Sequence, residues 1–477
     1  MLALTERVRQ RLSSLGPGVL PFADVADSEL SLQRILRLSL FQVSVGMALV
    51  LITGTLNRIM IVELGVSAWF VALMVALPVV FAPLRALIGY RSDTHKSAFG
   101  WRRVPFIWIG TTLQYGGLAI LPFSLLILSG TGQGPMIFGQ LGAGLAILLI
   151  GAGLHTTQTA GLALASDLAR PSVRPRVVAL LFVMLLIGMF LSALLFGWLL
   201  TDFTPLTLIR VIQSAAVITL CLNVVALWKQ EPRGRRRPVE EPAGPTFRAG
   251  LKELMENPRA KRLLVAVALG TAGFTMQDIL LEPFGGEILG LTVGATTGLT
   301  ALLAGGMLLA FAAAARYLAR GMDPNRLAAY GALVGIVAFA LIGFVSAFKL
   351  IALFALGVVL IGVGGGLFAM GTLTAAMALS REHNRGLALG AWGAVQATAT
   401  GVAIAAGGIL RDLVSALAVS GALGPGLTGP ATGYAIVYHL EWILLFTTLV
   451  VIGPLAAFSQ QTDSTGDHRF GMAEFPS

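Results

Sequence analysis

The 477-residue sequence contains few charged residues: Asp, Glu, Lys and Arg make up 12% of it, about half of the share in an ordinary soluble domain. Because 56% of the residues are hydrophobic, no aqueous core could bury them all, which excludes a water-soluble globular protein. The single cysteine, Cys221, excludes a disulfide framework, and Cys/His spacings typical of zinc sites are absent. Residues 1–30 lack the apolar core of a signal peptide, so we expect the first membrane span to direct insertion.

Sequence signatures of enzymes are missing as well. The sequence has no Walker loop, no Ser/His/Asp arrangement in a recognisable local context, and no dinucleotide-binding glycine motif after a strand. The glycine-rich stretch at 362–368 lies inside an apolar run, where glycines let membrane helices approach closely. We therefore expect a protein without catalytic activity.

Long uncharged runs indicate a multi-pass helical membrane protein. Residues 104–166 and 350–380 contain no Asp, Glu, Lys or Arg, whereas a helix needs about 20 apolar residues to cross a bilayer. Apolar runs separated by polar or glycine-rich breaks predict twelve transmembrane helices. They lie at 38–62, 67–90, 104–128, 136–166, 177–200, 207–228, 263–288, 293–315, 327–348, 350–379, 387–410 and 434–458.

The distribution of basic residues predicts the orientation of these helices. With both termini in the cytoplasm, the inner segments hold 28 of the 33 Lys and Arg residues, and the outer loops hold only Lys349 and Arg411. The other three, Arg58, Arg85 and Arg210, fall within or at the ends of spans. The formal net charge of +10 follows from this asymmetry. Its expected counterpart is the anionic surface of the lipid bilayer, and no nucleic acid is expected.

A basic inner segment at 229–262 divides the chain into two halves that resemble each other. Residues 151–165 parallel 364–378 at an offset of 213, and residues 55–61 parallel 275–281 at an offset of 220. The expected organisation has five parts. They are a cytoplasmic N-terminal segment (1–37), an N-terminal six-helix half (38–228), a basic cytoplasmic linker (229–262), a C-terminal six-helix half (263–458) and a cytoplasmic tail (459–477).

Two pseudo-symmetric six-helix halves joined by a basic loop resemble the major facilitator superfamily. The loop after the second span resembles that superfamily's signature at Gly89 and Asp93. Its paired basic residues correspond to Arg102 and Arg103, although Thr94 replaces the usual arginine after the aspartate. We expect these residues to form a conformational latch, because a carboxylate near helix ends can meet a helix dipole and a neighbouring arginine. The predicted fold is an all-α integral membrane protein of this superfamily.

Polar residues inside two spans are candidates for a functional cavity, because ionisable groups in a bilayer are costly. Asn57 and Arg58 lie in the first span, and Gln277 and Asp278 lie in the seventh together with Glu282. In the superfamily these helices are symmetry mates that line the central cavity. One hypothesis pairs Arg58 with Asp278 or Glu282; the alternative is an arginine that reaches the outer surface. For the carboxylates, proton relay, coordination of a hard metal and structural capping all remain open.

Two of the five histidines, His155 and His439, lie in predicted spans, and each has a small residue four positions earlier. On a helix, that spacing clears the face above the imidazole. A flat macrocycle whose central metal takes the histidine nitrogen would fit there, and the spacing resembles that of chlorophyll-binding helices. The alternative is a histidine bonded to a neighbouring helix. Gln158 and Glu282 are further pigment-binding candidates, and no metal is expected beyond a pigment magnesium at His155.

Four segments together resemble the PucC/LhaA proteins of phototrophic bacteria, also called the bacteriochlorophyll delivery family. They lie at 54–64, 89–96, 153–165 and 276–286, within a likeness that runs from about residue 20 to residue 460. Within this family the sequence is closer to the LhaA-like branch.

The resemblance implies a membrane assembly factor for the light-harvesting antenna, in particular the core complex around the reaction centre. Such a protein would deliver bacteriochlorophyll to the antenna α and β polypeptides or act as their chaperone. The implied cofactors are bacteriochlorophyll, bound or in transit, and a carotenoid. The implied partners are antenna polypeptides, reaction centre–antenna assembly intermediates, chlorophyll synthase and the membrane insertion machinery, in the bacterial inner or intracytoplasmic membrane.

Two other functions remain open. A proton-coupled transporter of a small solute would place Arg58, Asp278 and Glu282 along a path accessible to water. A pure scaffold would hold antenna helices against its glycine-rich faces without binding a ligand. Pigment delivery instead requires an apolar groove that opens sideways to the lipid.

Overall fold

A computed structural model describes residues 31–80, 88, 91–92, 101–130, 132, 134–170, 173–231, 256–378 and 385–462. These residues are helical and include no β-strand. The N-terminal half contains α2 (Leu32–Leu38), α3 (Leu40–Leu49), η2 (Val50–Thr55), α4 (Leu56–Arg58), η3 (Ile59–Glu63), α5 (Ala68–Val80), α7 (Val104–Leu128), α8 (Met136–Leu168), α9 (Arg174–Leu199) and α10 (Pro205–Leu227). The C-terminal half contains α12 (Pro258–Thr275), α13 (Leu281–Glu287), α14 (Val293–Ala319), α15 (Pro324–Phe348), α16 (Ile351–Ala378), α17 (Arg385–Val419) and α18 (Ala431–Thr462).

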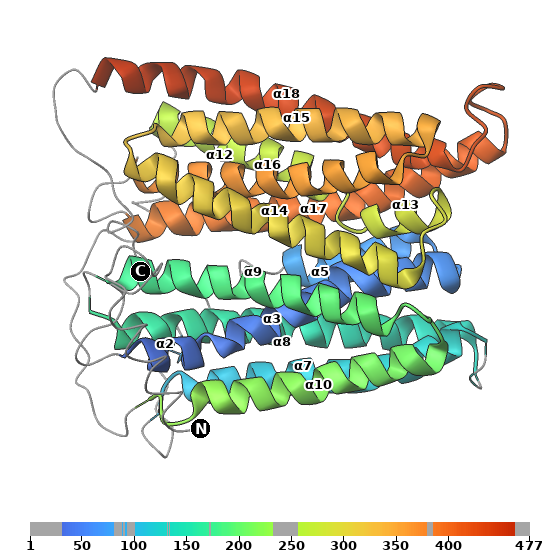
Figure 1. Ribbon diagram of the computed structural model, residues 1–477, viewed down its shortest axis with the longest axis horizontal. Helices are drawn as coiled ribbons and strands as arrows, with labels where there is room; N and C mark the ends of the chain where they lie inside the picture. The colour runs from blue at the N-terminus through green and yellow to red at the C-terminus, as the bar shows by residue number, and fades with distance from the viewer. Residues whose placement is uncertain are drawn as a thin grey trace, which may run out of the picture.

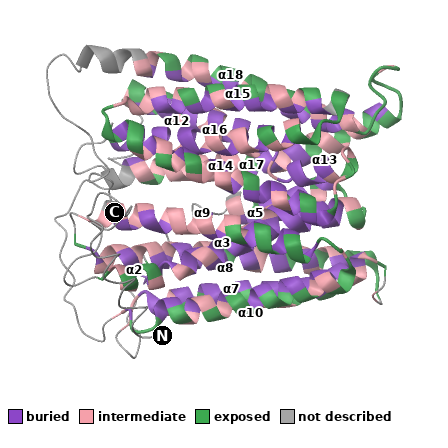
Figure 2. Cartoon of the chain, in the orientation of Figure 1, coloured by how far each residue is buried: buried purple, intermediate pink, exposed green. Residues whose placement is uncertain are grey.

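The helices form two groups that lie side by side, α2–α10 in one and α12–α18 in the other (Figure 1). The start of α2 and the end of α18 lie at the same end of the bundle (Figure 1). The predicted all-helical membrane architecture is therefore confirmed. Large apolar side chains on the outside, such as Trp198 at 73% exposure and Phe348 at 67%, suit contact with lipid. Exposed residues run along outer helices such as α10, whereas buried ones fill the interior (Figure 2).

Ten helices within the described ranges are long and apolar enough to cross a membrane. The third predicted span has the observed bounds of α7, 104–128. The second is described as α5 only as far as Val80, and the seventh is divided into α12 and α13 by residues 276–280. The total of twelve spans and the cytoplasmic placement of the termini stay predictions.

Several predicted boundaries shift because capping residues outside the apolar runs determine where helices begin. The Asn257 side chain accepts a hydrogen bond from Arg259 N (3.0 Å), and Pro258 occupies the first helical turn, so α12 begins inside the predicted linker. Helix α2 likewise begins at Leu32, inside the predicted N-terminal segment, and α18 continues into the predicted tail. Residues 1–30, 232–255 and 463–477 lie outside the described residues.

Glycines bring the two halves together where α9 crosses α14. A Cβ atom on Gly294 would collide with the carbonyl oxygen of Gly197, and one on Gly197 would lie 2.9 Å from the carbonyl oxygen of Gly294. Gly298, one turn further along α14, has nothing within 4 Å of its Cβ position. The crossing between the halves therefore depends on small residues, as is usual where membrane helices approach closely.

We predict that Gly294→Ala lowers the free energy of unfolding by about 1–3 kcal/mol, because the added methyl group pushes the halves apart. Thermal unfolding in one detergent measures this effect. Gly298→Ala is the matched control and should leave the melting temperature unchanged or raise it, since alanine favours the helix and meets no neighbour. Equal melting temperatures for the two variants would contradict this account of the crossing.

Candidate functional site

A break in the seventh helical segment is the centre of the buried polar residues in the C-terminal half. Helix α12 ends at Thr275, and α13 begins only at Leu281. The backbone N–H of Gln277 donates to Oε1 of Glu441 on α18 (2.7 Å), and the Gln277 side-chain amide donates to Oδ1 of Asp278 (2.9 Å). Since lipid supplies no acceptor, the Glu441 carboxylate satisfies a backbone donor at the break.

Glu441 was not among the predicted site residues, although the sequence carries a signal for it. It is the only charged residue between Asp412 and Asp463 and stands in the middle of an apolar run. In the structure Glu441 is fully buried, and its Oε2 atom has no hydrogen-bond partner among the described residues. An isolated carboxylate in an apolar span is by itself a functional or structural candidate.

Arg58 lies between two π-helical turns, η2 and η3, that widen the first span. Its side chain is 5% exposed; Nη1 forms an ion pair with Glu63, and Nη2 donates to the carbonyl oxygen of Leu291 (3.2 Å). Gly286 makes room for the guanidinium against α13. The direct ion pair of Arg58 is thus with Glu63, while Glu282, one of the two predicted partners, lies near enough to interact electrostatically with the guanidinium. A π-helix brings residue i+5 onto the same side, so a carboxylate on the arginine's own helix is the nearer partner.

Glu282 and Asn57 are also held by contacts within the protein. The hydroxyl of Thr300 donates to Glu282 Oε1 (2.5 Å), and Gly54 of η2 leaves room for this carboxylate. The Asn57 amide donates to the carbonyl oxygen of Thr53 (2.5 Å). No hydrogen bond or ion pair within the described chain joins Asn57 or Arg58 to Gln277 or Asp278. That these four residues line one cavity stays a prediction.

A second contact between the halves surrounds Arg411, which was expected in a loop but lies within α17. Arg411 forms ion pairs with Glu287 and, at 2.8 Å, with Asp412. The other Asp412 oxygen accepts from the backbone N–H of Trp69 on α5 (2.8 Å), and the Tyr434 hydroxyl donates to Glu287 (2.9 Å). By the predicted orientation these residues lie at the outer end of the bundle, where they fasten α5 to α17.

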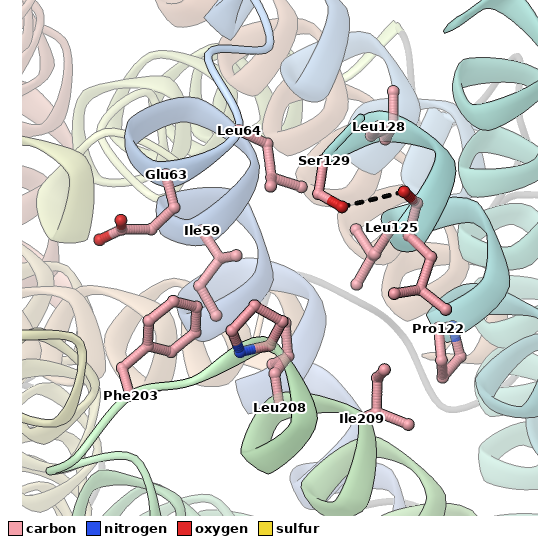
Figure 3. A pocket seen from close by; sticks show the side chains of 12 residues that line it. Ile59, Glu63, Leu64, Pro122, Leu125, Leu128, Ser129, Phe203, Leu208 and Ile209 are labelled. Carbon is pink, nitrogen blue, oxygen red and sulfur yellow. Dashed lines mark hydrogen bonds between the residues drawn. The ribbon is translucent and has the colours of Figure 1, made fainter. Parts of the chain in front are cut away.

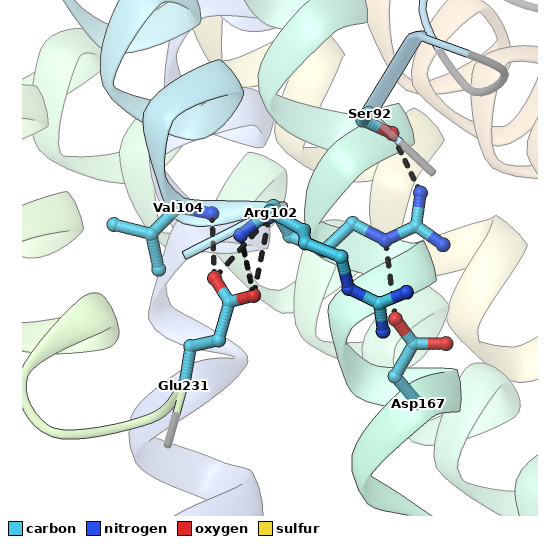
Figure 4. Close-up of polar contacts among 6 residues, drawn as sticks. Ser92, Arg102, Val104, Asp167 and Glu231 are labelled. Carbon is cyan, nitrogen blue, oxygen red and sulfur yellow. Dashed lines mark hydrogen bonds and ion pairs between the residues drawn. The ribbon is translucent and has the colours of Figure 1, made fainter. Parts of the chain in front are cut away.

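The predicted latch is described only in part, because Gly89 and Asp93 lie outside the described residues. Arg103 donates from Nε to Asp167 (3.1 Å) and from Nη1 to the hydroxyl of Ser92 (2.6 Å). Glu231 accepts from the backbone N–H groups of Arg102 (2.7 Å), Arg103 (3.2 Å) and Val104 (3.0 Å) at the start of α7 (Figure 4). A carboxylate at a helix N-terminus satisfies free donors and interacts favourably with the helix dipole. Neither Asp167 nor Glu231 was predicted.

An apolar hollow lies among the ends of three helices in the N-terminal half (Figure 3). Its volume is about 340 Å³, near the lower limit of ligand pockets. The lining is apolar except at Glu63 and Ser129. Its residues are Ile59, Glu63 and Leu64 from η3 and its end, Pro122, Leu125, Leu126, Leu128 and Ser129 from α7 and its end, and Phe203, Pro205, Leu208 and Ile209 from α10 and its start.

The two span histidines have different surroundings. His155 on α8 is half-buried, and the space expected beside Gly151 is filled by Pro78 of α5. Gln158 is buried, and its amide lies 3.5 Å from the Gln42 side-chain oxygen of α3. His439 is exposed on α18, where its Nδ1 atom lies 2.6 Å from the carbonyl oxygen of Ala435. Of these residues, only His439 faces outwards.

The described residues contain no group of three or more His, Cys, Asp or Glu side chains arranged to hold a metal ion.

Substitutions of Glu441 test its part at the helix break. Glu441→Gln keeps an oxygen acceptor for the Gln277 N–H and should unfold at nearly the wild-type temperature. Glu441→Leu removes the acceptor and leaves a buried donor unpaired, so we predict a loss of about 1–3 kcal/mol in the free energy of unfolding. If thermal unfolding in detergent shows no difference between the two variants, the carboxylate does not support the break.

Substitutions of Glu231 test the cap on α7. We predict that Glu231→Ala lowers the free energy of unfolding by about 1 kcal/mol and speeds amide hydrogen exchange at residues 102–104. Glu231→Gln, which keeps an acceptor but not the charge, should lie between wild type and Glu231→Ala. Unchanged exchange at these amides in Glu231→Ala would show that water replaces the cap without loss.

Comparison with known proteins shows likeness over most of the chain. A family model described as PUCC protein matches residues 55–459. The PucC protein of Rhodovulum sulfidophilum is 54% identical over 87% of this chain and 92% of its own length. A Rhodobacter capsulatus protein described by its position in the puhA–bchM intergenic region is 52% identical over 98% of this chain and 99% of its own length. The bacteriochlorophyll synthase 44.5 kDa chain of the same species is 29% identical over 80% of this chain and 88% of its own length.

Solved structures show the same fold at low identity. A bacterial homologue of the iron transporter ferroportin, in an inward-facing state, superposes with a TM-score of 0.65 at 16% identity and covers 90% of this chain and 100% of its own. The nucleoside transporter NupG (D323A mutant) superposes with a TM-score of 0.64 at 15% identity and covers 88% of this chain and 99% of its own. These likenesses confirm the predicted major facilitator architecture and show the fold alone.

Proposed function

The chain belongs to the PUCC family, and from that membership we propose that it is an assembly factor for the bacterial light-harvesting antenna. It would bring bacteriochlorophyll to the antenna α and β polypeptides, or hold these polypeptides, in the inner membrane of a phototrophic bacterium. The observation that carries the proposal is the 50–54% identity to PucC proteins over 87–94% of the chain. The identity to solved transporters is only 13–17%.

Contacts at and beside the seam between the halves are compatible with this proposal. Arg58 is engaged by Glu63 and Leu291, and Glu282 is engaged by Thr300. The hydroxyls of Thr55 and Thr297 meet across the halves at 3.2 Å. An apolar pigment or an antenna helix can approach from the lipid without disturbing these contacts.

The hollow among η3, α7 and α10 also suits an apolar ligand. Its volume of about 340 Å³ accommodates a hydrocarbon chain or a small ring. A long isoprenoid tail could enter it while a flat headgroup stayed outside. The carotenoid, chlorophyll synthase, reaction centre–antenna intermediates and insertion machinery that the family resemblance implies belong to the same proposal as further partners.

Proton-coupled transport remains the second candidate function because of the break at 276–280. Glu441 is buried beside that break, and Asp278 lies within it, so two carboxylates occur at a non-helical segment of the bilayer interior. Such breaks are binding-site features of several transporters. The two functions differ in whether these carboxylates must change protonation during activity.

One experiment separates the candidates in a phototrophic host that lacks its own copy of this chain. We predict that the deletion strain accumulates less antenna absorbance per reaction centre and that wild type restores it. Asp278→Asn and Glu441→Gln keep the hydrogen-bonding shape but cannot carry a proton, and they should restore the antenna as well as wild type does. Loss of antenna in both variants, with normal protein levels, would favour proton coupling. Unchanged antenna in the deletion strain would overturn the assembly proposal.

A further inference from the structure

The exposed face of α18 carries a polar side chain where lipid is expected. His439 is exposed, as are Ile436, Ile443 and Phe446 at 44%, 55% and 44%. These positions follow one another at intervals of three and four residues, so they share one side of the helix. His439 lies eight residues after the start of α18, which is about 12 Å along the axis at 1.5 Å per residue. Because α18 has 32 residues, about 48 Å at that rise, it is longer than a hydrocarbon layer of about 30 Å, and His439 lies toward the end that the predicted orientation places outside.

The hydrogen bond at Nδ1 determines which nitrogen of His439 is free to bind. Nδ1 lies 2.6 Å from the carbonyl oxygen of Ala435. Because a carbonyl can only accept, Nδ1 carries the proton and Nε2 carries the lone pair. Histidines that ligate metals almost always have this arrangement, with the other ring nitrogen donating to a carbonyl or carboxylate.

The lone pair on Nε2 has no hydrogen-bond donor within the described chain. An unpaired polar atom in hydrocarbon is unfavourable, and lipid tails cannot relieve it. A ligand for this site must therefore contain an electron-pair acceptor, and the rest of the ligand must be apolar. The central metal of a membrane-borne tetrapyrrole has both properties.

Aromatic side chains next to His439 provide a surface for a flat ring. Trp442 and Phe446 pack edge to face with centroids 4.8 Å apart, and their exposed fractions are 36% and 44%. They stand three and seven residues after His439, on the same side of α18. Aromatic faces contribute both apolar area and favourable stacking geometry to a macrocycle.

We propose that Nε2 of His439 is the axial ligand of a magnesium tetrapyrrole that reaches α18 from the bilayer and lies against Trp442 and Phe446. This inference rests on the proposed function, because the pigment is the cargo proposed there. His155 is the less suitable histidine, since Pro78 fills the space beside Gly151 and the imidazole is half-buried.

Titration of the purified full-length protein in lipid nanodiscs tests the proposal. The probes are bacteriochlorophyll a and its metal-free counterpart, bacteriopheophytin a, and the readout is the absorption band that reports magnesium coordination. Wild type should bind the magnesium pigment more tightly than the metal-free one. His439→Phe should lose this preference, with a loss of about tenfold or more in affinity for bacteriochlorophyll. Bacteriopheophytin binding should stay the same.

Two control variants make the result specific. His155→Phe removes the other span histidine, and Ile443→Ala changes the same face of α18 without touching the ligand; both should keep the preference for the magnesium pigment. If His439→Phe keeps that preference while His155→Phe loses it, the inference is overturned and pigment delivery stands. If His439→Phe binds pigment normally but no longer co-purifies with antenna polypeptides, the face docks a helix and the inference is again overturned. A wild-type protein that binds neither pigment overturns both the inference and the pigment part of the proposed function.

Discussion

A bilayer offers no hydrogen-bond partner to a broken helix, and the contact between the seventh helical segment and α18 meets this constraint. Within the break at 276–280, the N–H groups of Met276, Asp278 and Leu280 donate to backbone carbonyls, and Glu441 of α18 accepts from the N–H of Gln277. This bond joins α18 to the segment that follows α12. The Glu282 carboxylate accepts at Oε1 from Thr300, which ties α13 to α14, and its Oε2 atom has no hydrogen-bond partner among the described residues. Polar residues in the interior thus act first as parts of the helix packing.

Arg58 shows how local backbone geometry decides the partner of a buried charge. Symmetry between the halves and the cost of a charge in lipid both favoured a carboxylate across the seam. The π-helical turns around Arg58 instead bring Glu63 of the same segment within reach, and Leu291 supplies a carbonyl from the other half. Sequence periodicity assumes a regular α-helix, so it could not predict this partner.

The spans themselves were largely predictable, because the thickness of the bilayer sets their length and excludes charge from them. The third span, 104–128, agrees with the structure at both ends. Contacts such as Glu231 on the start of α7 were not predictable, since they join residues more than a hundred positions apart. Glu441 is an intermediate case. The sequence shows that it is isolated in an apolar run, but it does not show that its partner is the backbone N–H of Gln277.

The histidines show why a local motif was not enough to choose between two sites. Gly151 and Ala435 both precede a histidine by four residues, yet Gly151 accommodates Pro78 of a neighbouring helix, whereas Ala435 supplies a carbonyl to its own histidine. Membrane helices are apolar on all sides, so hydropathy does not tell which side faces lipid. Only packing separates a histidine within the bundle from one on its surface. Within a family that shares a transporter fold, an exposed face such as that of α18 is one place where a different task can be carried out. A lipid-facing Nε2 with a fixed lone pair is a feature that solute transport does not require and that binding a metal-centred pigment does.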